Sequence, residues 1–443
     1  MNVTELSSFT DHYFSFLGAY IFSKNGYNFL LGKNGCAIII SDDLLHSLQE
    51  QRPSDALKLK LVQHGLAIVP GKQPVLRESC IDVRYFIIDL TKQCNFHCIY
   101  CFRDFKHFNQ ITYEVLQDII DFIISYCKQK RIANIGLQMW GGEPLLALDK
   151  IEYVINAFAD SDIKAHIDIE TNASLVTEEI ARKLKEWDVN VGVSLDGTPQ
   201  LQNLQRPLAT GLPSSALVEQ GVRNLQKYYG NNIGGISVVT KYNFQKIKEI
   251  LDYFIYDLRL SSMKFNLVRD NMNASEQTLS LTDEEIQFFV EDLTGYLEAY
   301  RIIGARFSEG NIEVRLRNLL QRNGNNCCVS RGCQGGRKMI SFNYQGDIFP
   351  CEMIDFPDER IGSIYDNKDL DSQIKKALNK NSFFLPKNDK SCANCPWRYF
   401  CQGGCSSRNK YLEKEGQIDR VECCLNKTLY PKLVEWILDG KVS

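Results

Sequence analysis

The stretch Cys94-Asn95-Phe96-His97-Cys98-Ile99-Tyr100-Cys101 decides the expected fold. Its three cysteines are separated by three and then by two residues, so their sulfurs can converge on one small volume. Three thiolates leave one position open on a tetrahedral zinc ion or on a four-iron cluster, and a small molecule can bind and react there. An apolar strand is expected just upstream, over residues 82–90. Because barrels and doubly wound sheets keep their chemistry at the carboxyl ends of strands, the stretch predicts a reactive metal centre in an α/β fold.

Length and composition bound the class of protein. At 443 residues the chain is longer than one ordinary domain, so two or three domains are expected. Hydrophobic residues make up 44% and charged residues 24%, which allows a sizeable core. The net charge of −3 gives no signal for nucleic-acid binding, and no apolar run reaches the roughly 18 residues that span a membrane. The amino terminus shows no signal-peptide pattern, so we expect a cytoplasmic protein without nucleic-acid or membrane partners.

The sixteen cysteines favour metal binding over disulfides. In a chain without an export signal, the reducing cytosol keeps thiols free. Thirteen of them lie in two groups, three at positions 94–101 and ten between Cys327 and Cys424. Clustering of this kind is typical of metal ligands, whereas Cys36, Cys80 and Cys127 are scattered in apolar contexts and are interpreted as small core residues.

Alternating strand and helix patterns predict an α/β domain over residues 81–308. Helical periodicity is found between the strands, for example over residues 113–128 and 177–187. Strands are predicted at residues 82–90, 134–139, 165–170, 189–195, 233–240 and 263–267. Six such units in series call for parallel strands with right-handed crossovers, and six are too few for a closed eight-fold barrel. We therefore expect a partial (β/α)6 barrel.

The two ends of the chain differ from this domain. Residues 1–80 are predicted to form strands at 20–22, 28–31 and 37–40, helices at 41–51 and 54–63, and a strand at 65–69, followed by a linker at 72–78. This order suits a small winged-helix-like module. Residues 309–443 are rich in cysteine and glycine, and metal rather than a core is expected to hold them.

The cysteine spacing together with Tyr100 resembles the signature of the radical S-adenosylmethionine (radical SAM) enzymes. In that family three cysteines hold a [4Fe–4S] cluster, and the amino and carboxylate groups of SAM chelate the fourth iron. The resemblance implies a partial (β/α)6 barrel, with Cys94, Cys98 and Cys101 as cluster ligands and Tyr100 at the cofactor site. The alternative is a zinc knuckle whose fourth ligand lies elsewhere.

Gly141-Gly142-Glu143-Pro144 follows the second predicted strand. Paired glycines let the backbone approach a ligand closely. The motif resembles the GGEP motif of the family, which implies that Gly141, Gly142 and Glu143 bind SAM through its amino group. A plain turn, or a Glu143 that only braces the loop, is the alternative.

Other strand ends carry further candidate SAM contacts. Ser194 ends the fourth strand, where its hydroxyl could bond a ribose, and Arg206 follows twelve residues later. Similar enzymes use an arginine here to clasp the SAM carboxylate; a surface arginine in a loop is the alternative. Leu267 ends the sixth strand, where family members contact adenine. At the third strand end the family more often has glycine in place of Ala173, which leaves the role of Asn172 open.

The carboxy-terminal cysteines resemble the SPASM domain of radical SAM maturases, which carries two auxiliary [4Fe–4S] clusters. By position, one cluster takes Cys327, Cys333, Cys351 and Cys405, and the other takes Cys392, Cys395, Cys401 and Cys423. Cys328 and Cys424 are adjacent alternatives, and a pair of zinc sites is the alternative for the whole region. Glu352 follows Cys351, at the position where sulfatase-maturing relatives carry an aspartate as proton acceptor; the alternative is a solvated surface charge.

The resemblance implies a peptide or protein maturase with a one-electron donor such as flavodoxin or ferredoxin as partner. It would cleave SAM reductively to a 5′-deoxyadenosyl radical and abstract hydrogen from a ribosomally made peptide, installing a crosslink or another modification. The amino-terminal module looks similar to the elements that bind leader segments of such peptides, although a packing extension is the other interpretation. The competing functions are oxidation of a Cys or Ser in a sulfatase-like protein, and an iron–sulfur or zinc scaffold without turnover.

Overall fold

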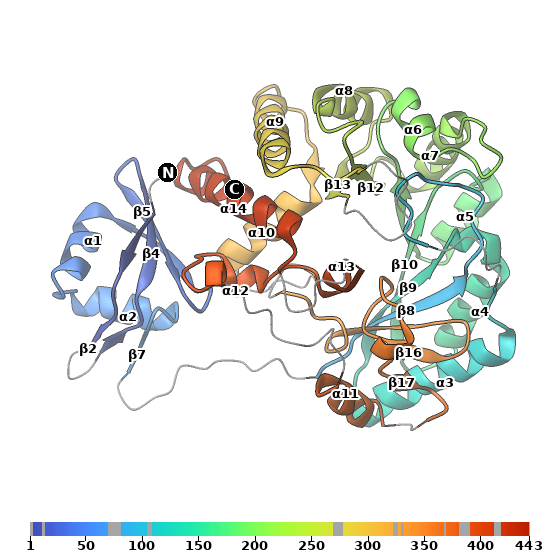
Figure 1. Ribbon diagram of the computed structural model, residues 1–443, viewed down its shortest axis with the longest axis horizontal. Coiled ribbons are helices and arrows are strands. Elements are labelled where there is room, and N and C mark those ends of the chain that lie inside the picture. Colours follow the sequence, from blue (N-terminus) through green and yellow to red (C-terminus); the bar gives the residue numbers. More distant parts are fainter. Residues whose placement is uncertain are drawn as a thin grey trace.

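The computed structural model describes residues 3–10, 14–69, 81–103, 109–268, 278–321, 327–328, 332–366, 369–380, 390–411 and 418–442. The predicted linker at 72–78 and Cys80 lie outside these ranges. In Figure 1 the amino-terminal module lies at one end of the molecule, the barrel helices at the other, and the last helix, α14 (Arg420–Leu438), between them. No helix in the described part of the chain is long and apolar enough to cross a membrane.

Six parallel strands form the centre of the fold, as predicted. They are β8 (Tyr85–Thr91), β9 (Asn134–Gly141), β10 (Lys164–Thr171), β11 (Asn190–Ser194), β12 (Gly234–Val239) and β13 (Ser262–Leu267). They are neighbours in sequence order, and β14 (Ser308–Glu309) extends the sheet in parallel beyond β13. The right-handed repetition of strand and helix curves this sheet into the expected partial barrel.

The connecting helices cover the outer face of the sheet (Figure 1). They are α3 (Tyr113–Lys130), the 3-10 turn η1 (Pro144–Ala147), α4 (Leu148–Ala159), α5 (Glu178–Glu186), α6 (Pro199–Gln205), α7 (Ser215–Tyr229), α8 (Ile247–Asp252), the π-helical turn η2 (Tyr253–Asp257) and α9 (Asp283–Ile302). The hydroxyls of Thr112, Thr177 and Thr282 each cap a helix amino terminus by accepting a backbone N–H bond. Fully buried side chains such as Leu137 and Ile119 fill the layer between strands and helices.

The carboxy-terminal region continues the barrel sheet. Strand β15 (Met339–Phe342) pairs in parallel with β8, and β16 (Asp347–Phe349) and β17 (Gly362–Ser363) follow as antiparallel neighbours. Its other elements are α10 (Gly310–Gln321), η3 (Pro357–Glu359), α11 (Leu370–Leu378), η5 (Lys390–Cys392), α12 (Arg398–Cys401), α13 (Ser406–Tyr411) and α14 (Arg420–Leu438). The predicted boundary at 308/309 therefore falls inside β14. The region is also not held by metal alone, because Leu429, Leu433 and Val434 of α14 join the main core.

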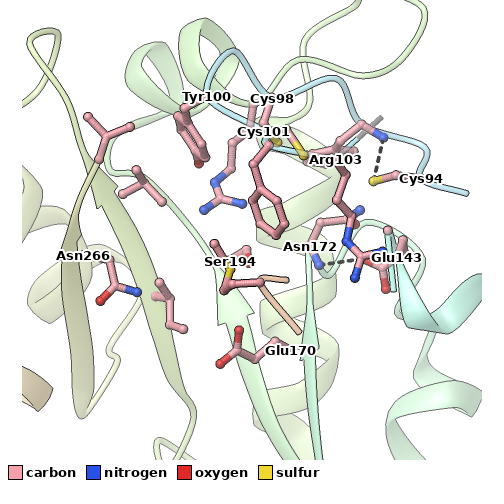
Figure 2. Close-up of a pocket in the computed structure, with 18 of the residues that line it drawn as sticks. Cys94, Cys98, Tyr100, Cys101, Arg103, Glu143, Glu170, Asn172, Ser194 and Asn266 are labelled. Atoms are coloured by element: carbon pink, nitrogen blue, oxygen red, sulfur yellow. Dashed lines mark hydrogen bonds between the residues drawn. The ribbon is translucent and has the colours of Figure 1, made fainter. Parts of the chain in front are cut away.

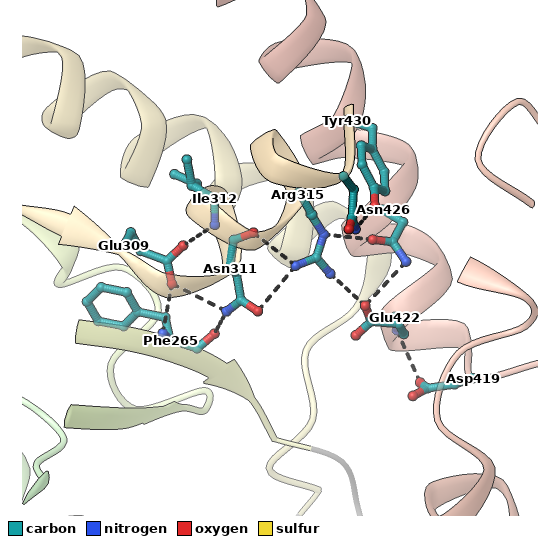
Figure 3. A network of polar contacts seen from close by, with 10 residues as sticks. Phe265, Glu309, Asn311, Ile312, Arg315, Asp419, Glu422, Asn426 and Tyr430 are labelled. Carbon is teal, nitrogen blue, oxygen red and sulfur yellow. Dashed lines mark hydrogen bonds and ion pairs between the residues drawn. The ribbon is translucent and has the colours of Figure 1, made fainter. Parts of the chain in front are cut away.

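A buried polar network ties the last barrel strand to α14 (Figure 3). The backbone N–H of Phe265 on β13 donates to the Glu309 carboxylate, and Asn311 Nδ2 donates to the backbone carbonyl of Phe265. Arg315, which is fully buried, donates to Asn311 Oδ1 at 3.2 Å, to Asn426 Oδ1 at 2.8 Å and to Glu422 Oε1 at 2.6 Å. One guanidinium therefore joins the barrel to the helix that carries Cys423 and Cys424.

The amino-terminal module contains two small sheets and two helices. One sheet has the order β1 (Val3–Leu6), β4 (Ala19–Lys24), β5 (Tyr27–Gly32), β6 (Ala37–Ser41), and the other joins β2 (Phe9–Thr10), β3 (Ser15–Phe16) and β7 (Ala67–Ile68). The helices are α1 (Asp42–Gln49) and α2 (Asp55–Gln63). The three predicted strands, two helices and last strand are present. Strands β1, β2 and β3 were not predicted, since β1 is largely exposed and two-residue strands show no periodicity.

One face of the module packs on the carboxy-terminal region. The rings of Phe22 and Trp397 lie with centroids 5.1 Å apart. Lys24 Nζ lies 2.6 Å from Glu435 Oε1 and 2.8 Å from Asp439 Oδ2, both on or next to α14. The module therefore packs on the carboxy-terminal region, as the interpretation of it as a packing extension expected.

Candidate functional site

A cavity of about 280 Å³ opens at the carboxyl ends of the barrel strands (Figure 2). All of the sequence-predicted barrel residues line it, namely Cys94, Cys98, Tyr100, Cys101, Gly141, Gly142, Glu143, Ser194, Arg206 and Leu267. These residues come from five separate segments of the chain, and the parallel sheet brings them to one edge. The sequence therefore located the cavity, while the role of each residue in it stays a prediction.

The cysteine loop leaves β8 and lies against the segment that follows α6. His97 N donates to Pro207 O at 2.9 Å and Ile99 N to Gln205 O at 3.0 Å. Phe96 forms an antiparallel bridge with Leu208 and is 1% exposed, which anchors the middle of the loop. These contacts fix the loop with its thiols toward the cavity.

Burial determines the protonation of the thiols. With a contribution from the neighbouring thiol of Cys101, it raises the pKa of Cys94 to about 11 and the pKa of Cys98 to about 12. The thiols are therefore neutral at pH 7 until a metal displaces their protons. Three convergent thiols beside an open cavity fit an iron–sulfur cluster with one free iron position. Among the described residues, no three His, Cys, Asp or Glu side chains are grouped so as to hold a single metal ion.

The glycine pair packs against the cysteine loop. A Cβ on Gly142 would lie 2.2 Å from Gln93 O and 3.0 Å from Cys94 Cβ, so only glycine fits. Gly142 N donates to Thr91 O and Glu143 N to Gln93 O, at 2.8 and 2.9 Å. The motif is therefore more than a free turn, because it presses the end of β9 onto the loop that carries the thiols.

Glu143 braces the site from within. It is 1% exposed and accepts from the Thr171 hydroxyl at 2.7 Å and from the backbone N–H groups of Asn172 and Leu145 at 2.8 and 3.1 Å. Burial raises its pKa to about 7, against the three hydrogen bonds that lower it. These contacts show that Glu143 braces the loop, as the alternative interpretation held. The predicted contact with SAM would come in addition.

Asn172 and Ala173 have structural roles that the sequence left open. Asn172 Nδ2 donates to Asn95 Oδ1 at 2.8 Å, which ties the end of β10 to the cysteine loop. Ala173 has φ +61°, the left-handed region in which glycine is most at ease, and this explains why glycine is the usual residue there.

Arg206 forms a buried cluster with Asp196 and Tyr100. Its Nε lies 3.0 Å from Asp196 Oδ2, the same oxygen that accepts from the Tyr100 hydroxyl at 2.5 Å. The guanidinium also lies 5.3 Å from the Tyr100 ring centroid. With 7% exposure Arg206 is not a surface arginine, so that alternative is wrong. Sequence reasoning missed Asp196 as its partner, although an acidic residue at a strand end was the available signal.

Further residues of the cavity were not predicted. Glu170 faces it from the end of β10 below Ser194, as Figure 2 shows, and burial raises its pKa to about 7. Met353 and Arg408 line the cavity from the carboxy-terminal region, more than 80 residues beyond the last barrel strand. Nothing in the local sequence could have found these two.

The carboxy-terminal cysteines form two groups in space. Cys392, Cys395, Cys401 and Cys423 line one small cavity of about 20 Å³ between η5, α12 and α14. Cys424 instead turns toward α9, where its thiol donates to Asp283 O at 3.6 Å. The structure thus gathers the predicted set and separates Cys424 from it.

The second group surrounds Cys351. Burial raises the pKa of Cys351, and the nearby Glu352, Cys333 and Cys405 raise it further. Cys327 and Cys328 both lie close enough to Cys333 for its charge to raise the pKa of each thiol, so the choice between them stays open. Glu352 is half-buried, and its Oε2 is buried without a hydrogen-bond partner in the described ranges, which does not fit a solvated surface charge.

Comparisons with known proteins agree with this geometry. The model of the Radical SAM superfamily matches residues 88–254. A cysteine-type anaerobic sulfatase-maturating enzyme of Clostridium novyi is 25% identical over 363 residues, which cover 77% of this chain and 92% of that protein. The solved structure of anSMEcpe with bound AdoMet has a TM-score of 0.70 at 20% identity and covers 81% of this chain and 100% of that one. Streptococcus suis SuiB bound to precursor peptide SuiA has a TM-score of 0.56 at 15% identity, covering 89% of this chain and 96% of that one.

The structural likenesses show the fold, a partial barrel followed by a cysteine-rich region. The family match spans the cysteine loop, the glycine pair and Arg206, which the structure collects around one cavity. Residues 88–254 therefore form a Radical SAM domain, and the chain is a radical SAM enzyme, with S-adenosylmethionine and [4Fe–4S] clusters as its cofactors.

Proposed function

We propose that this enzyme is a maturase that modifies a ribosomally made peptide. The observation that carries the proposal is the composition of the barrel cavity. The cysteine loop and SAM-motif residues line it from the barrel, and Met353 and Arg408 line it from the cysteine-rich region. A substrate that enters would therefore lie between the SAM site and the auxiliary cysteines.

The chain's own residues bind and orient. Cys94, Cys98 and Cys101 would hold the first cluster, with Gly141, Gly142 and Glu143 placed for the amino group of SAM. Arg206, fixed by Asp196, would hold the SAM carboxylate, because a guanidinium can bond a carboxylate with two parallel N–H groups. Ser194 and Leu267, which line the same cavity, would contact the ribose and the adenine. When bound, these cofactors supply hydrogen-atom abstraction from the substrate.

Glu352 is our candidate for the group that receives the substrate proton. Glu352 lines a cavity next to the SAM site, its Oε2 is buried without a hydrogen-bond partner in the described ranges, and it follows Cys351 of the proposed auxiliary set. A positioned base typically contributes about 10²–10⁴-fold to the rate. Glu352→Gln would keep the shape and remove the basicity.

The amino-terminal module is proposed to bind the leader segment of the substrate. Its larger sheet ends in two edge strands, and β1 is mostly exposed. An extended peptide can add to such an edge through main-chain hydrogen bonds. SuiB, crystallised with its precursor peptide, shares the fold over 89% of this chain. Removal of residues 1–69 would weaken precursor binding if this is right and would leave it unchanged if the module only packs.

A second candidate is oxidation of a Cys or Ser in a sulfatase-like protein. It is favoured by the likeness to the C. novyi sulfatase-maturating enzyme, which extends over 92% of that protein. The two candidates differ in substrate and share the cavity.

The test uses anaerobically reconstituted, reduced full-length protein. It should convert SAM to 5′-deoxyadenosine, and Cys98→Ala should not. Two peptides are then compared by mass spectrometry: a short precursor encoded beside this gene, and a sulfatase peptide with its Cys. Modification of the precursor alone supports the proposal, modification of the Cys peptide supports the second candidate, and modification of neither overturns both.

A further inference from the structure

Asp196 follows β11 and is fully buried, although proteins seldom bury an aspartate without partners. Its backbone N–H donates to Gln202 Oε1 at 2.9 Å, and its carboxylate Oδ1 accepts from the backbone N–H of Val238 on β12 at 2.8 Å. Asn243 Nδ2 donates to its backbone carbonyl at 3.3 Å. These three bonds hold Asp196 in place, and none of them uses its second carboxylate oxygen, Oδ2.

This second oxygen serves two groups of the SAM site. The Tyr100 hydroxyl donates to Asp196 Oδ2 at 2.5 Å, and Arg206 Nε lies 3.0 Å from the same atom. The contact with Arg206 is an ion pair without the alignment of a hydrogen bond, because the Nε N–H has no acceptor in line among the described residues. One carboxylate oxygen therefore contacts both the cysteine loop and an arginine that lines the cavity.

Tyr100 connects this oxygen to the cysteine loop. It stands between Cys98 and Cys101, which form a turn in which Cys101 N donates to Cys98 O at 3.0 Å. The hydroxyl bond to Asp196 thus ties the turn that carries two of the three thiols to the end of β11. An aromatic ring without a hydroxyl could not make this bond.

Arg206 keeps its outer nitrogens available. Asp196 and the Tyr100 ring, whose centroid lies 5.3 Å from the guanidinium carbon, both contact it. Neither Nη group has a hydrogen-bond partner in the described part of the chain, and neither is among the polar atoms closed off from solvent. Because a guanidinium pairs best with a carboxylate through two parallel N–H groups, an Arg206 fixed at Nε can offer its two Nη groups to SAM.

We propose that Asp196 is a positioning residue that couples two parts of the cofactor site. Through Oδ2 it holds Arg206 for the carboxylate of SAM, and through the Tyr100 hydroxyl it holds the turn with Cys98 and Cys101. The inference rests on the proposed role of Arg206 and is independent of the peptide substrate. It assigns a function to the tyrosine hydroxyl that another aromatic residue in the cysteine loop would lack.

The test measures the Kd of SAM by isothermal titration calorimetry. It uses anaerobically reconstituted full-length protein with its clusters oxidised, so that SAM binds without being cleaved, and variants are compared at equal iron content. Asp196→Asn keeps the size and the Oδ1 acceptor and removes the charge beside Arg206. SAM should bind this variant about 10- to 100-fold more weakly, as expected for one lost contact to a charged group.

A second ligand separates positioning from general damage. Decarboxylated SAM lacks the group that Arg206 is proposed to hold, so its Kd should be nearly the same in the wild type and in Asp196→Asn. A variant whose site is merely distorted would bind both ligands more weakly.

Tyr100→Phe supplies the arm for the hydroxyl. It keeps the ring beside Arg206 and removes one hydrogen bond, so SAM should bind about fivefold more weakly. Tyr300→Phe is the matched control, because the buried Tyr300 also donates to a carboxylate, that of Asp252, and lines a different cavity. That variant should bind SAM with unchanged Kd.

The inference is overturned if Asp196→Asn binds SAM like the wild type, if SAM and decarboxylated SAM lose affinity equally, or if Tyr100→Phe and Tyr300→Phe behave alike. Arg206→Met tests the role on which the inference rests. Unchanged SAM binding in Arg206→Met would refute that role together with the inference. Weaker binding there, beside wild-type binding in Asp196→Asn, would refute the inference alone.

Discussion

The barrel cavity and the cysteine-rich region gather thiols in different ways. Cys94, Cys98 and Cys101 lie within eight residues on one loop, which is fixed by backbone hydrogen bonds to Gln205 and Pro207. Cys392, Cys395, Cys401 and Cys423 extend over 32 residues and three elements, and they meet only where α14 passes α12. A local loop on a parallel sheet thus makes the first site, whereas helix packing makes the other.

The difference teaches where each site should be vulnerable. The first depends on its own cysteines and on the strand ends around it. The second depends in addition on the contacts that hold α14 in place. One of these is the hydrogen bond from Arg315 to Asn426, a residue that lines the cavity of the four cysteines. Substitutions in the cysteine-rich region should therefore disturb the barrel site less than substitutions in the barrel disturb the cysteine-rich site.

The largest effect is expected from cysteine removal. Cys98→Ala should abolish 5′-deoxyadenosine formation and leave about eight of about twelve irons, if all three clusters are four-iron cubes. Cys395→Ala should lose about four irons and retain SAM cleavage. Iron analysis and product chromatography on anaerobically prepared protein measure both. Loss of SAM cleavage in Cys395→Ala would show that the two regions are not independent.

The next effect concerns the joint between the regions. Arg315→Met removes a fully buried guanidinium and with it the ion pair to Glu422, whose side chain is 12% exposed. Breaking a buried pair in this way costs about 3–5 kcal/mol of unfolding free energy. Chemical denaturation measures this loss of stability. The iron held by Cys392, Cys395, Cys401 and Cys423 should be lost first, because Cys423 lies on α14.

Arg317→Met is the control for this joint. It lies on the same helix, is 58% exposed and pairs with Glu313 four residues before it. An exposed pair contributes less than about 1 kcal/mol. Equal losses in the two variants would mean that the buried network does not hold the regions together.

A smaller effect is expected from pH at the barrel cavity. Burial raises the pKa of Glu170 from 4.5 to about 7, with Glu352 and Asp168 adding to the rise and Lys264 and Arg206 opposing it. The folded state thus binds this proton more tightly than the unfolded state, so stability falls as pH rises from 4.5 to about 7 and then levels off. Relative to Glu170→Gln, the wild type should lose about 3 kcal/mol over this window. Unfolding curves at several pH values measure the difference, and parallel curves would contradict it.

The smallest effect is expected from Cys424→Ala, with the neighbouring Cys423→Ala as its comparison. Cys424→Ala removes a thiol that donates to Asp283 O, so no iron should be lost. Cys423→Ala should lose about four irons, because its thiol faces the four-cysteine cavity. Iron loss in Cys424→Ala instead would exchange the two assignments.

Much of the barrel site could be predicted from the sequence. The six strands repeat at regular spacing, and the carboxyl ends of parallel strands meet at one edge, so motifs at strand ends become neighbours. Cys98 and Gly142 were predicted at this edge because they follow strands, whereas Arg206 was predicted only from the resemblance to radical SAM enzymes. Asp196 and Glu170 stand at strand ends as well, but their types alone did not separate a structural role from a functional one.

What the sequence by itself determined is therefore set by local spacing: the cysteine loop, the glycine pair and the alternation of strands and helices. The tertiary structure alone decided which distant residues meet. The antiparallel strands of the amino-terminal module dock on α14, Met353 reaches the SAM cavity, and Cys423 rather than Cys424 turns to its partners. The physical reason is that consecutive residues on a helix point about 100° apart, and only the packing of that helix fixes which one faces the cavity.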